Sequence, residues 1–158
     1  MDYELLAREF LRSLRGSRSQ VAWSRRLGYR SNVAYSWEKG RRWPTAAEAF
    51  RAAERNGVDL DQALRHFFGH GVPTWVESLN LTTAKATAAM LDEMRGNTTI
   101  VELSRRTGSS RFAISRWLTG QTEPKLPDFF RLFEVSSTRL IDLVSALTDP
   151  DTVPMVAE

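Results

Sequence analysis

Apolar residues recur three or four positions apart along most of the chain, and glycines and prolines interrupt this pattern at short intervals. Leu6, Phe10 and Leu14 follow the spacing before Gly16 breaks it. Such a repeat places apolar side chains on one face of an α-helix. Leucine, alanine and phenylalanine dominate the apolar residues, which favours helices over sheet. The pattern therefore predicts an all-α fold.

Capping residues divide the first half of the chain into five short helices. Ser19 precedes the second helix, and Ser31 is expected to cap the third. After Pro44, Thr45 and Glu48 have the spacing of a capping box, in which each side chain bonds the other residue's free amide. The expected helices cover about residues 2–14, 19–27 and 31–40, then begin again near 45 and at 59.

The sequence repeats itself at an offset of eighty residues. Between residues 10–64 and 90–144, fifteen of fifty-five positions are identical, whereas chance would give about three or four. Turn glycines, aromatic residues and prolines recur, for example Trp37/Trp117 and Pro44/Pro124. Both halves are therefore predicted to share one fold. The helices of the second half are expected at about 83–94, 99–106, 110–119, 127–134 and 138–147.

The repeat predicts two tandem five-helix domains, at residues 1–70 and 81–148. A glycine- and proline-containing segment marks the linker, residues 71–80, which Trp75 and Val76 are expected to anchor to one domain. The tail, residues 149–158, is polar and broken by prolines, so it is expected to be disordered.

Positive charge is concentrated in the first half. The whole chain carries a net charge of +3, but residues 8–42 hold ten basic and two acidic side chains, a local charge of +8. The equivalent residues, 88–122, hold five basic and three acidic side chains, or +2. A basic surface suggests a polyanionic partner, and a solvated basic face is the alternative.

Residues 19–40 have the arrangement of a known two-helix motif. Two short helices are joined there by Gly28, Tyr29 and Arg30, as in a helix-turn-helix. The stretch resembles the phage-repressor family, also called the Cro/CI or XRE type. The matching residues are Ser19-Gln20, Ser24, Gly28, Glu38-Lys39-Gly40 and Arg41-Arg42-Trp43-Pro44.

The second half, residues 99–124, keeps the spacing of this motif and changes its residues. Ile100 replaces the glutamine, Leu118 the glutamate, and Gln121-Thr122 the two arginines. The two matches together resemble the tandem N-terminal half of longer bacterial transcriptional regulators. This resemblance implies a cytoplasmic, nucleoid-associated protein that binds double-stranded DNA.

A helical wheel gives the candidate contacts. With Ala34 and Trp37 turned inward, Asn32 and Ser36 should point outward. Asparagine can pair with adenine, arginine with guanine, and phenylalanine can contact a thymine methyl group. The candidate base-reading residues are Ser31, Asn32, Tyr35, Ser36, Arg111, Phe112, Ser115 and Arg116. The family resemblance implies phosphate contacts for Gln20, Arg30, Lys39, Arg41 and Arg42.

Several of these residues also have structural interpretations. Trp37 and Trp117 are expected in the core, and Glu38 is expected to pair with an arginine of the first helix. An outward Phe112 requires either DNA or a protein surface. Trp43 stays open between DNA, a dimer contact and simple packing.

Two other function classes compete with a DNA-binding regulator. The weaker charge of the second half fits a protein-binding adaptor or antitoxin-like module in which only the first helix-turn-helix binds DNA. An RNA binder ranks lower, because no aromatic-studded sheet motif is present. A homodimer or a partner protein is compatible with either class.

Catalytic motifs find little support. His66 and His70 are four residues apart, but Gly69 separates them and no glutamate follows His66. Glycine-rich phosphate loops are lacking as well. We therefore expect no enzyme activity, cofactor, metal or small-molecule substrate. The absence of cysteine and of a run of about 18 apolar residues is consistent with a cytoplasmic location away from membranes.

Overall fold

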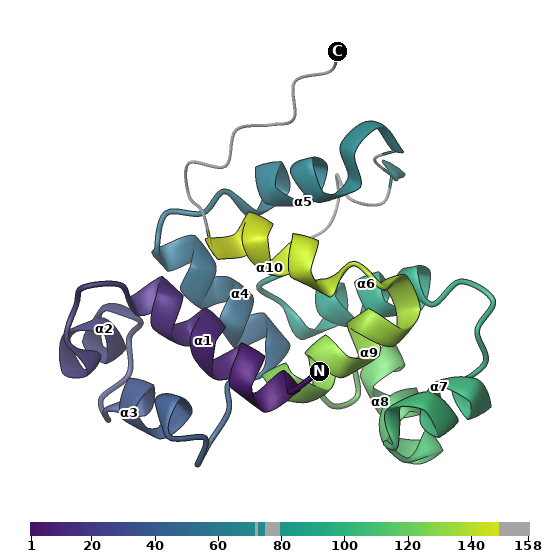
Figure 1. The fold of residues 1–158 in the computed structure, drawn as a ribbon, viewed down its shortest axis with the longest axis horizontal. Coiled ribbons are helices and arrows are strands. Elements are labelled where there is room, and N and C mark those ends of the chain that lie inside the picture. The colour runs from purple at the N-terminus through teal and green to yellow at the C-terminus, as the bar shows by residue number, and fades with distance from the viewer. Residues whose placement is uncertain (72, 75–79, 149–158) are drawn as a thin grey trace.

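A computed structural model of the chain describes residues 1–71, 73–74 and 80–148 (Figure 1). In these ranges the fold is all-α, as predicted. The first half contains α1 (Tyr3–Arg15), α2 (Gln20–Arg26), α3 (Val33–Glu38), α4 (Ala46–Arg55), α5 (Leu60–Phe68) and a short 3-10 turn, η1 (Gly69–Gly71). The second half contains α6 (Ala84–Met94), α7 (Ile100–Thr107), α8 (Arg111–Thr119), α9 (Leu126–Ser137) and α10 (Leu140–Thr148).

Side-chain caps start most of these helices. Ser19 caps α2, and Thr45 forms the predicted capping box with Glu48 at α4. The expectation that Ser31 caps α3 is wrong. Asn32 is the N-cap, because its carboxamide oxygen accepts a hydrogen bond from the Tyr35 N–H. Consequently α3 begins two residues later than Ser31.

The two halves meet where α4 and α9 begin. Thr45 and Lys125 lie opposite each other in an isolated antiparallel bridge. The Ala46 N–H donates to the Pro124 carbonyl at 3.1 Å, and the Leu126 N–H donates to the Pro44 carbonyl at 2.9 Å. These bonds join equivalent positions of the repeat, so the two halves are held symmetrically at this point.

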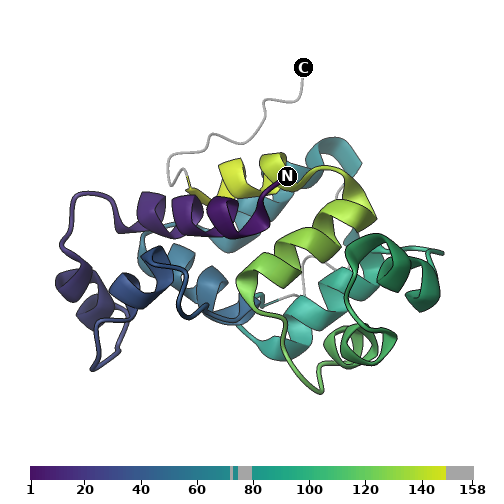
Figure 2. The same ribbon diagram turned by 60° about the horizontal axis from the view of Figure 1, so that its bottom comes forward.

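The helices of the two halves also pack in a reciprocal way. The fifth helices of the two halves, α5 and α10, pack on each other. Helix α1 packs on α9 just as its equivalent α6 packs on α4. Such reciprocity is what an approximate two-fold axis between the halves produces. Figures 1 and 2 place α2–α3 and α7–α8 at opposite ends of the long axis, both toward the lower border.

Aromatic side chains join the halves into one core. Phe10 meets Phe130 edge to face at 5.8 Å between ring centroids, and Phe50 meets Phe129 at 5.5 Å. Buried residues of both halves form one continuous hydrophobic cluster. The predicted boundaries at residues 70 and 81 therefore separate two repeats that share a core.

Parts of the prediction fall outside the described residues. The anchoring by Trp75 and Val76 is one such part, and the disorder of residues 149–158 is another. Each helix in the described ranges is too short or too polar to cross a lipid bilayer.

Candidate nucleic-acid interface

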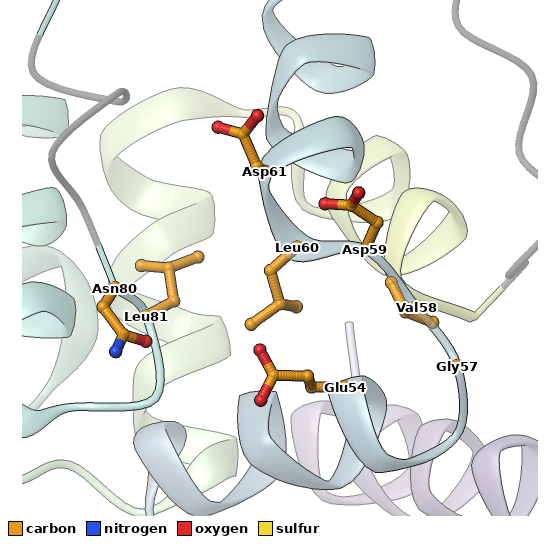
Figure 3. A pocket seen from close by; sticks show the side chains of 8 residues that line it. All are labelled: Glu54, Gly57, Val58, Asp59, Leu60, Asp61, Asn80 and Leu81. Atoms are coloured by element: carbon orange, nitrogen blue, oxygen red, sulfur yellow. The ribbon is translucent and has the colours of Figure 1, made fainter.

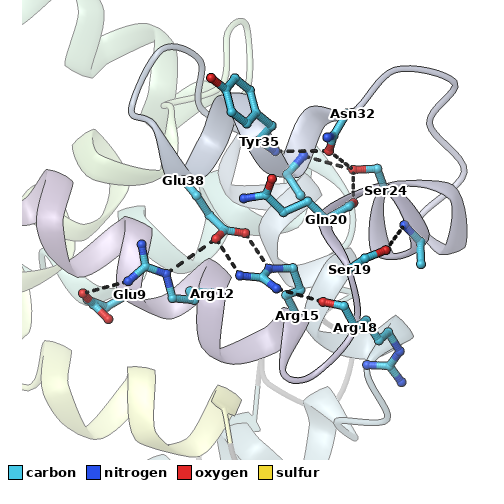
Figure 4. Close-up of polar contacts among 12 residues, drawn as sticks. Glu9, Arg12, Arg15, Arg18, Ser19, Gln20, Ser24, Asn32, Tyr35 and Glu38 are labelled. Carbon is cyan, nitrogen blue, oxygen red and sulfur yellow. Dashed lines mark hydrogen bonds and ion pairs between the residues drawn. The ribbon is translucent and has the colours of Figure 1, made fainter.

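Ser24 ties α2 to the start of α3. Its hydroxyl is buried, lies 2.8 Å from the Gln20 carbonyl oxygen, and accepts the Ala34 N–H at 3.0 Å (Figure 4). The same hydroxyl lies 3.2 Å from the Asn32 carboxamide oxygen. One small polar side chain thereby fixes the spacing between the two helices, which explains why a serine fits this position of the motif.

Trp37 determines which face of α3 points into the protein. Its ring meets Trp23 at 5.8 Å and Tyr29 at 5.7 Å, both edge to face, and it is buried as predicted. Trp117 is only half-buried, so its expected place in the core is wrong in part. The equivalents of Trp23 and Tyr29 are Leu103 and Ser109, which offer smaller surfaces to cover the indole ring.

Glu38 fastens the end of α3 to α1, as predicted. Its carboxylate accepts hydrogen bonds from Arg15 Nε at 2.7 Å and Arg15 Nη2 at 2.9 Å, and Arg12 Nε lies 3.5 Å away (Figure 4). Burial disfavours the charge, but hydrogen bonds from Arg15, Gln20 and Arg12 outweigh it and lower the pKa of Glu38. The Gln20 side chain therefore has a structural partner besides its predicted phosphate contact.

The outward face of α3 is polar and basic. Ser31, Tyr35 and Lys39 are exposed, while Ser36 is half-buried. Lys39 Nζ lies 5.6 Å from the centroid of the Tyr35 ring, and the Arg41 guanidinium carbon lies 5.8 Å from it. The predicted phosphate contacts flanking this face are also exposed: Arg30, Arg41 and Arg42.

Asn32 does not project freely from α3, contrary to the helical wheel. It is half-buried, and its carboxamide oxygen is occupied by the cap and by Ser24. The wheel places it wrongly because it assumes that Asn32 already lies within the helix. The carboxamide Nδ2 has no hydrogen-bond partner among the described residues, so a base contact through it stays a prediction.

Helix α8 presents a different outward face. Arg111 and Arg116 are exposed, and Phe112 is 67% exposed, as predicted. The Arg116 guanidinium lies 4.0 Å from the Phe112 ring centroid, in a cation–π contact. Ser115 is half-buried. Both outward faces therefore combine one aromatic side chain with cations, but the ring is the apolar Phe112 in the second half and the polar Tyr35 in the first.

Helices α3 and α8 start differently. Ser110 caps α8 by accepting the Ala113 N–H at 3.0 Å, and it stands at the position equivalent to Arg30. As a result α8 begins two positions earlier in the repeat than α3 and has nine residues instead of six.

The loops that follow α3 and α8 have nearly the same backbone. The Arg41 N–H donates to the Ser36 carbonyl at 3.0 Å, and the equivalent Gln121 N–H donates to the Arg116 carbonyl at 3.0 Å. The next residues, Arg42 and Thr122, are exposed in the same way. The two loops therefore differ mainly in side-chain charge.

Tyr29 links the turn between α2 and α3 to α4, a contact that the sequence analysis missed. Its hydroxyl donates to Glu48 Oε2 at 2.6 Å. Burial, together with this hydrogen bond, raises the pKa of Tyr29 above its usual 10.0. The capping-box spacing identified Glu48 for its backbone role, but gave no signal of a second partner in a distant turn.

Trp43 packs, half-buried, against the hydrophobic core, which favours the packing interpretation among the three left open.

An open pocket of about 510 Å³ lies between the end of α4, the start of α5 and the residues before α6 (Figure 3). Glu54, Asp59 and Asp61 line it together with Leu60 and Leu81. Three carboxylates would repel a phosphate backbone, so we do not include this pocket in the candidate nucleic-acid interface. Within the described ranges, no cluster of three or more acidic, histidine or cysteine residues could hold a metal ion.

No protein-family model, curated protein or solved structure matches this chain.

Proposed function

We propose that this chain is a sequence-specific transcriptional regulator that binds double-stranded DNA through two phage-repressor-like helix-turn-helix units. The observation that carries the proposal is the pair of short helices α3 and α8. Each is fastened by buried apolar residues, Ala34 and Trp37 on α3 and Ile114 on α8. The exposed side of α3 carries Tyr35 with Lys39 directly after the helix, and that of α8 carries Phe112 between basic residues. A short, anchored helix with an exposed polar face suits the major groove.

The exposed side chains fit two roles in this proposal. Arg30, Lys39, Arg41 and Arg42 neutralise phosphates and supply most of the affinity. The exposed residues of α3 and α8 contact base edges and supply the sequence preference. Because these residues differ between the two helices, the two half-sites that they prefer differ as well.

Selection of bound fragments from random duplex DNA tests the proposal. The enriched duplex is then titrated with fluorescence detection between about 50 and 200 mM salt, where affinity should fall steeply. Replacing Arg41 and Arg42 with alanine should flatten the salt dependence and weaken all sequences alike. Arg65→Ala on α5, at the opposite border of the molecule (Figure 1), is the control and should change it little. No binding even at low salt would reject the proposal.

One observation favours a second candidate, a protein-binding adaptor or antitoxin-like module. Phe112 is 67% exposed, and a large exposed aromatic side chain is common at protein interfaces. Under this alternative only the first unit binds DNA. Phe112→Ala would then leave DNA affinity unchanged and abolish self-association or partner binding, whereas a DNA contact predicts a loss at one half-site.

A further inference from the structure

We infer that one chain acts as a built-in dimer, which binds a single duplex whose two half-sites are unlike in sequence, inverted in orientation and fixed in spacing. This inference rests on the proposed function and specifies its ligand. Its structural basis is the approximate two-fold relationship between the halves.

The bridge between Thr45 and Lys125 is the first support. These residues are eighty positions apart, so each is the other's equivalent in the repeat. Equivalent residues can face each other only where the symmetry axis passes. The two hydrogen bonds of the bridge, from Ala46 to Pro124 and from Leu126 to Pro44, are also equivalents of each other.

The packing of α5 on α10 is the second support, because these helices are also equivalents and meet away from the bridge. At this contact Arg139 Nη2 donates to the Phe67 carbonyl at 2.7 Å, and the Arg139 guanidinium stacks on the Phe67 ring at 4.2 Å. Phe67 also meets Phe133 at 5.7 Å between ring centroids. These side-chain contacts are not themselves symmetric, but the packing of two equivalent helices gives a second point on the axis and so fixes its direction.

The axis relates α3 to α8. An axis through the bridge and the α5–α10 contact brings both helices to the same border of the molecule, which is where Figures 1 and 2 show them. Duplex DNA has two-fold axes of its own, perpendicular to the helix, so a two-fold protein matches inverted half-sites. A direct repeat would require translation of one unit past the other, which the shared core prevents.

The shared core also removes the need for a second copy. In a homodimer two equal chains present two equal helices and therefore prefer a palindrome. Here the core already pairs two helices that differ, with Tyr35 on α3 and Lys39 at its C-cap, and Phe112 and Arg116 on α8. One chain should thus occupy one asymmetric site.

Operator variants test the arrangement with the full chain. On the selected duplex, we expect one chain per duplex by native mass spectrometry. Turning one half-site around reverses the order of bases that its helix meets, and inserting about 5 base pairs between the half-sites rotates one site away from its helix. Either alteration should weaken binding roughly ten- to a hundredfold. The control inserts the same base pairs outside the site. Two chains per duplex, or unchanged affinity after either alteration, would overturn the inference.

A reversible crosslink tests whether the halves bind DNA in the arrangement described. Thr45 and Lys125 form a non-hydrogen-bonded antiparallel pair, because the two bonds of the bridge join the residues on either side of them. Their Cβ atoms are expected about 4.5 Å apart, within reach of a disulfide. The chain has no cysteine, so Thr45→Cys with Lys125→Cys forms a single defined bridge. The oxidised and reduced forms of this variant should bind the operator equally.

The outcomes separate this inference from the proposed function. If oxidation weakens binding about tenfold or more and reduction restores it, the halves must separate to bind, and the built-in dimer is wrong while DNA binding stands. If neither form of the variant binds any duplex, and the unaltered chain binds none either, the proposed function itself is wrong.

Discussion

Thr45 and Lys125 are equivalent residues of a sequence repeat, and they face each other across an antiparallel bridge. The helices that start beside them differ in their caps. Thr45 caps α4 in a capping box, whereas Lys125 makes no side-chain cap and α9 relies on a proline in its first turn. The bridge therefore joins two residues that differ in side chain and in capping, which indicates that the pairing of the halves rests on the backbone and the aromatic core.

The ion pair between Arg15 and the buried Glu38 leads to a stability prediction. Glu38→Gln keeps the shape but removes the charge that Arg15 and Arg12 surround, and should lower the free energy of unfolding by about 2–3 kcal/mol in urea denaturation at pH 7. Glu102→Gln is the control, because its ion pair with Arg105 is exposed. Equal effects of the two substitutions would contradict a special role for Glu38.

The same pair predicts a pH dependence. The pKa of Glu38 is lowered from 4.5, so its stabilising contribution is complete above pH 4.5 and is lost as the pH falls through the folded-state pKa. The difference in unfolding free energy between the wild type and Glu38→Gln should therefore shrink below about pH 4.5. A difference that stays constant down to pH 3 would show that the carboxylate charge is not responsible.

Tyr29→Phe tests the contact between the turn and α4. Loss of the hydrogen bond to the Glu48 carboxylate should cost about 1.5 kcal/mol of unfolding free energy at pH 7. Because the folded-state pKa of Tyr29 is raised, its contribution is complete below pH 10.0 and declines as the pH rises further. Tyr35→Phe, at an exposed ring, is the control and should leave stability unchanged.

The sequence was sufficient to predict the helices, because caps and glycines act locally. The predicted pairing of Glu38 with an arginine of the first helix is confirmed, with Arg12 and Arg15 in the last turn of α1 as its partners. The sequence could not predict how the halves dock. Helix α9 has buried phenylalanines on more than one face: Phe129, Phe130 and Phe133. An apolar pattern does not show which of these faces packs against its own half of the chain and which packs against the other half.

The candidate site shows the same division. Outward placement of Phe112 and Arg116 followed from helical periodicity, since α8 begins early enough to include both. The periodicity failed for Asn32, because it lies one residue before α3 begins and its backbone is not helical, so a helical wheel does not give the direction of its side chain. The prediction that Trp117 is buried failed in part, because periodicity gives the direction of a side chain and not the size of the residues around it, and Leu103 and Ser109 stand where the first half has Trp23 and Tyr29.

Substitutions at Asn32 separate capping from base contact. Asn32→Ser preserves an N-cap oxygen and removes the carboxamide Nδ2, whereas Asn32→Ala removes both. Both should weaken preference at one half-site by about 1–3 kcal/mol, but only the alanine variant should lose about 1 kcal/mol of stability. Affinities on the operator and on random duplex provide the measurement. Equal weakening on both duplexes would indicate that Asn32 contacts backbone and not bases.

Arg116 is expected to read the other half-site. Arg116→Lys keeps the positive charge and loses the bidentate hydrogen-bonding geometry that pairs with guanine. It should therefore relax the base preference at the α8 half-site only. Base substitutions in each half-site, one at a time, show which preference is lost. The double variant with Asn32→Ser should show additive losses, since α3, which Asn32 caps, and α8, which contains Arg116, lie toward opposite ends of the molecule (Figure 1).

The matching loops after α3 and α8 predict a gain of affinity. Gln121 and Thr122 occupy the backbone positions of Arg41 and Arg42, with nearly the same hydrogen bonds, but carry no charge. If both units lie on one duplex, Gln121→Arg with Thr122→Arg adds two phosphate contacts and steepens the salt dependence of log affinity by about two. The reciprocal change, Arg41→Gln with Arg42→Thr, should flatten it by as much. Asp61→Arg on α5, which by itself also raises the net charge by two, is the control for net charge. If the loop variant gains no more than this control, the second unit stays off the DNA, and the adaptor alternative becomes the better explanation for α8.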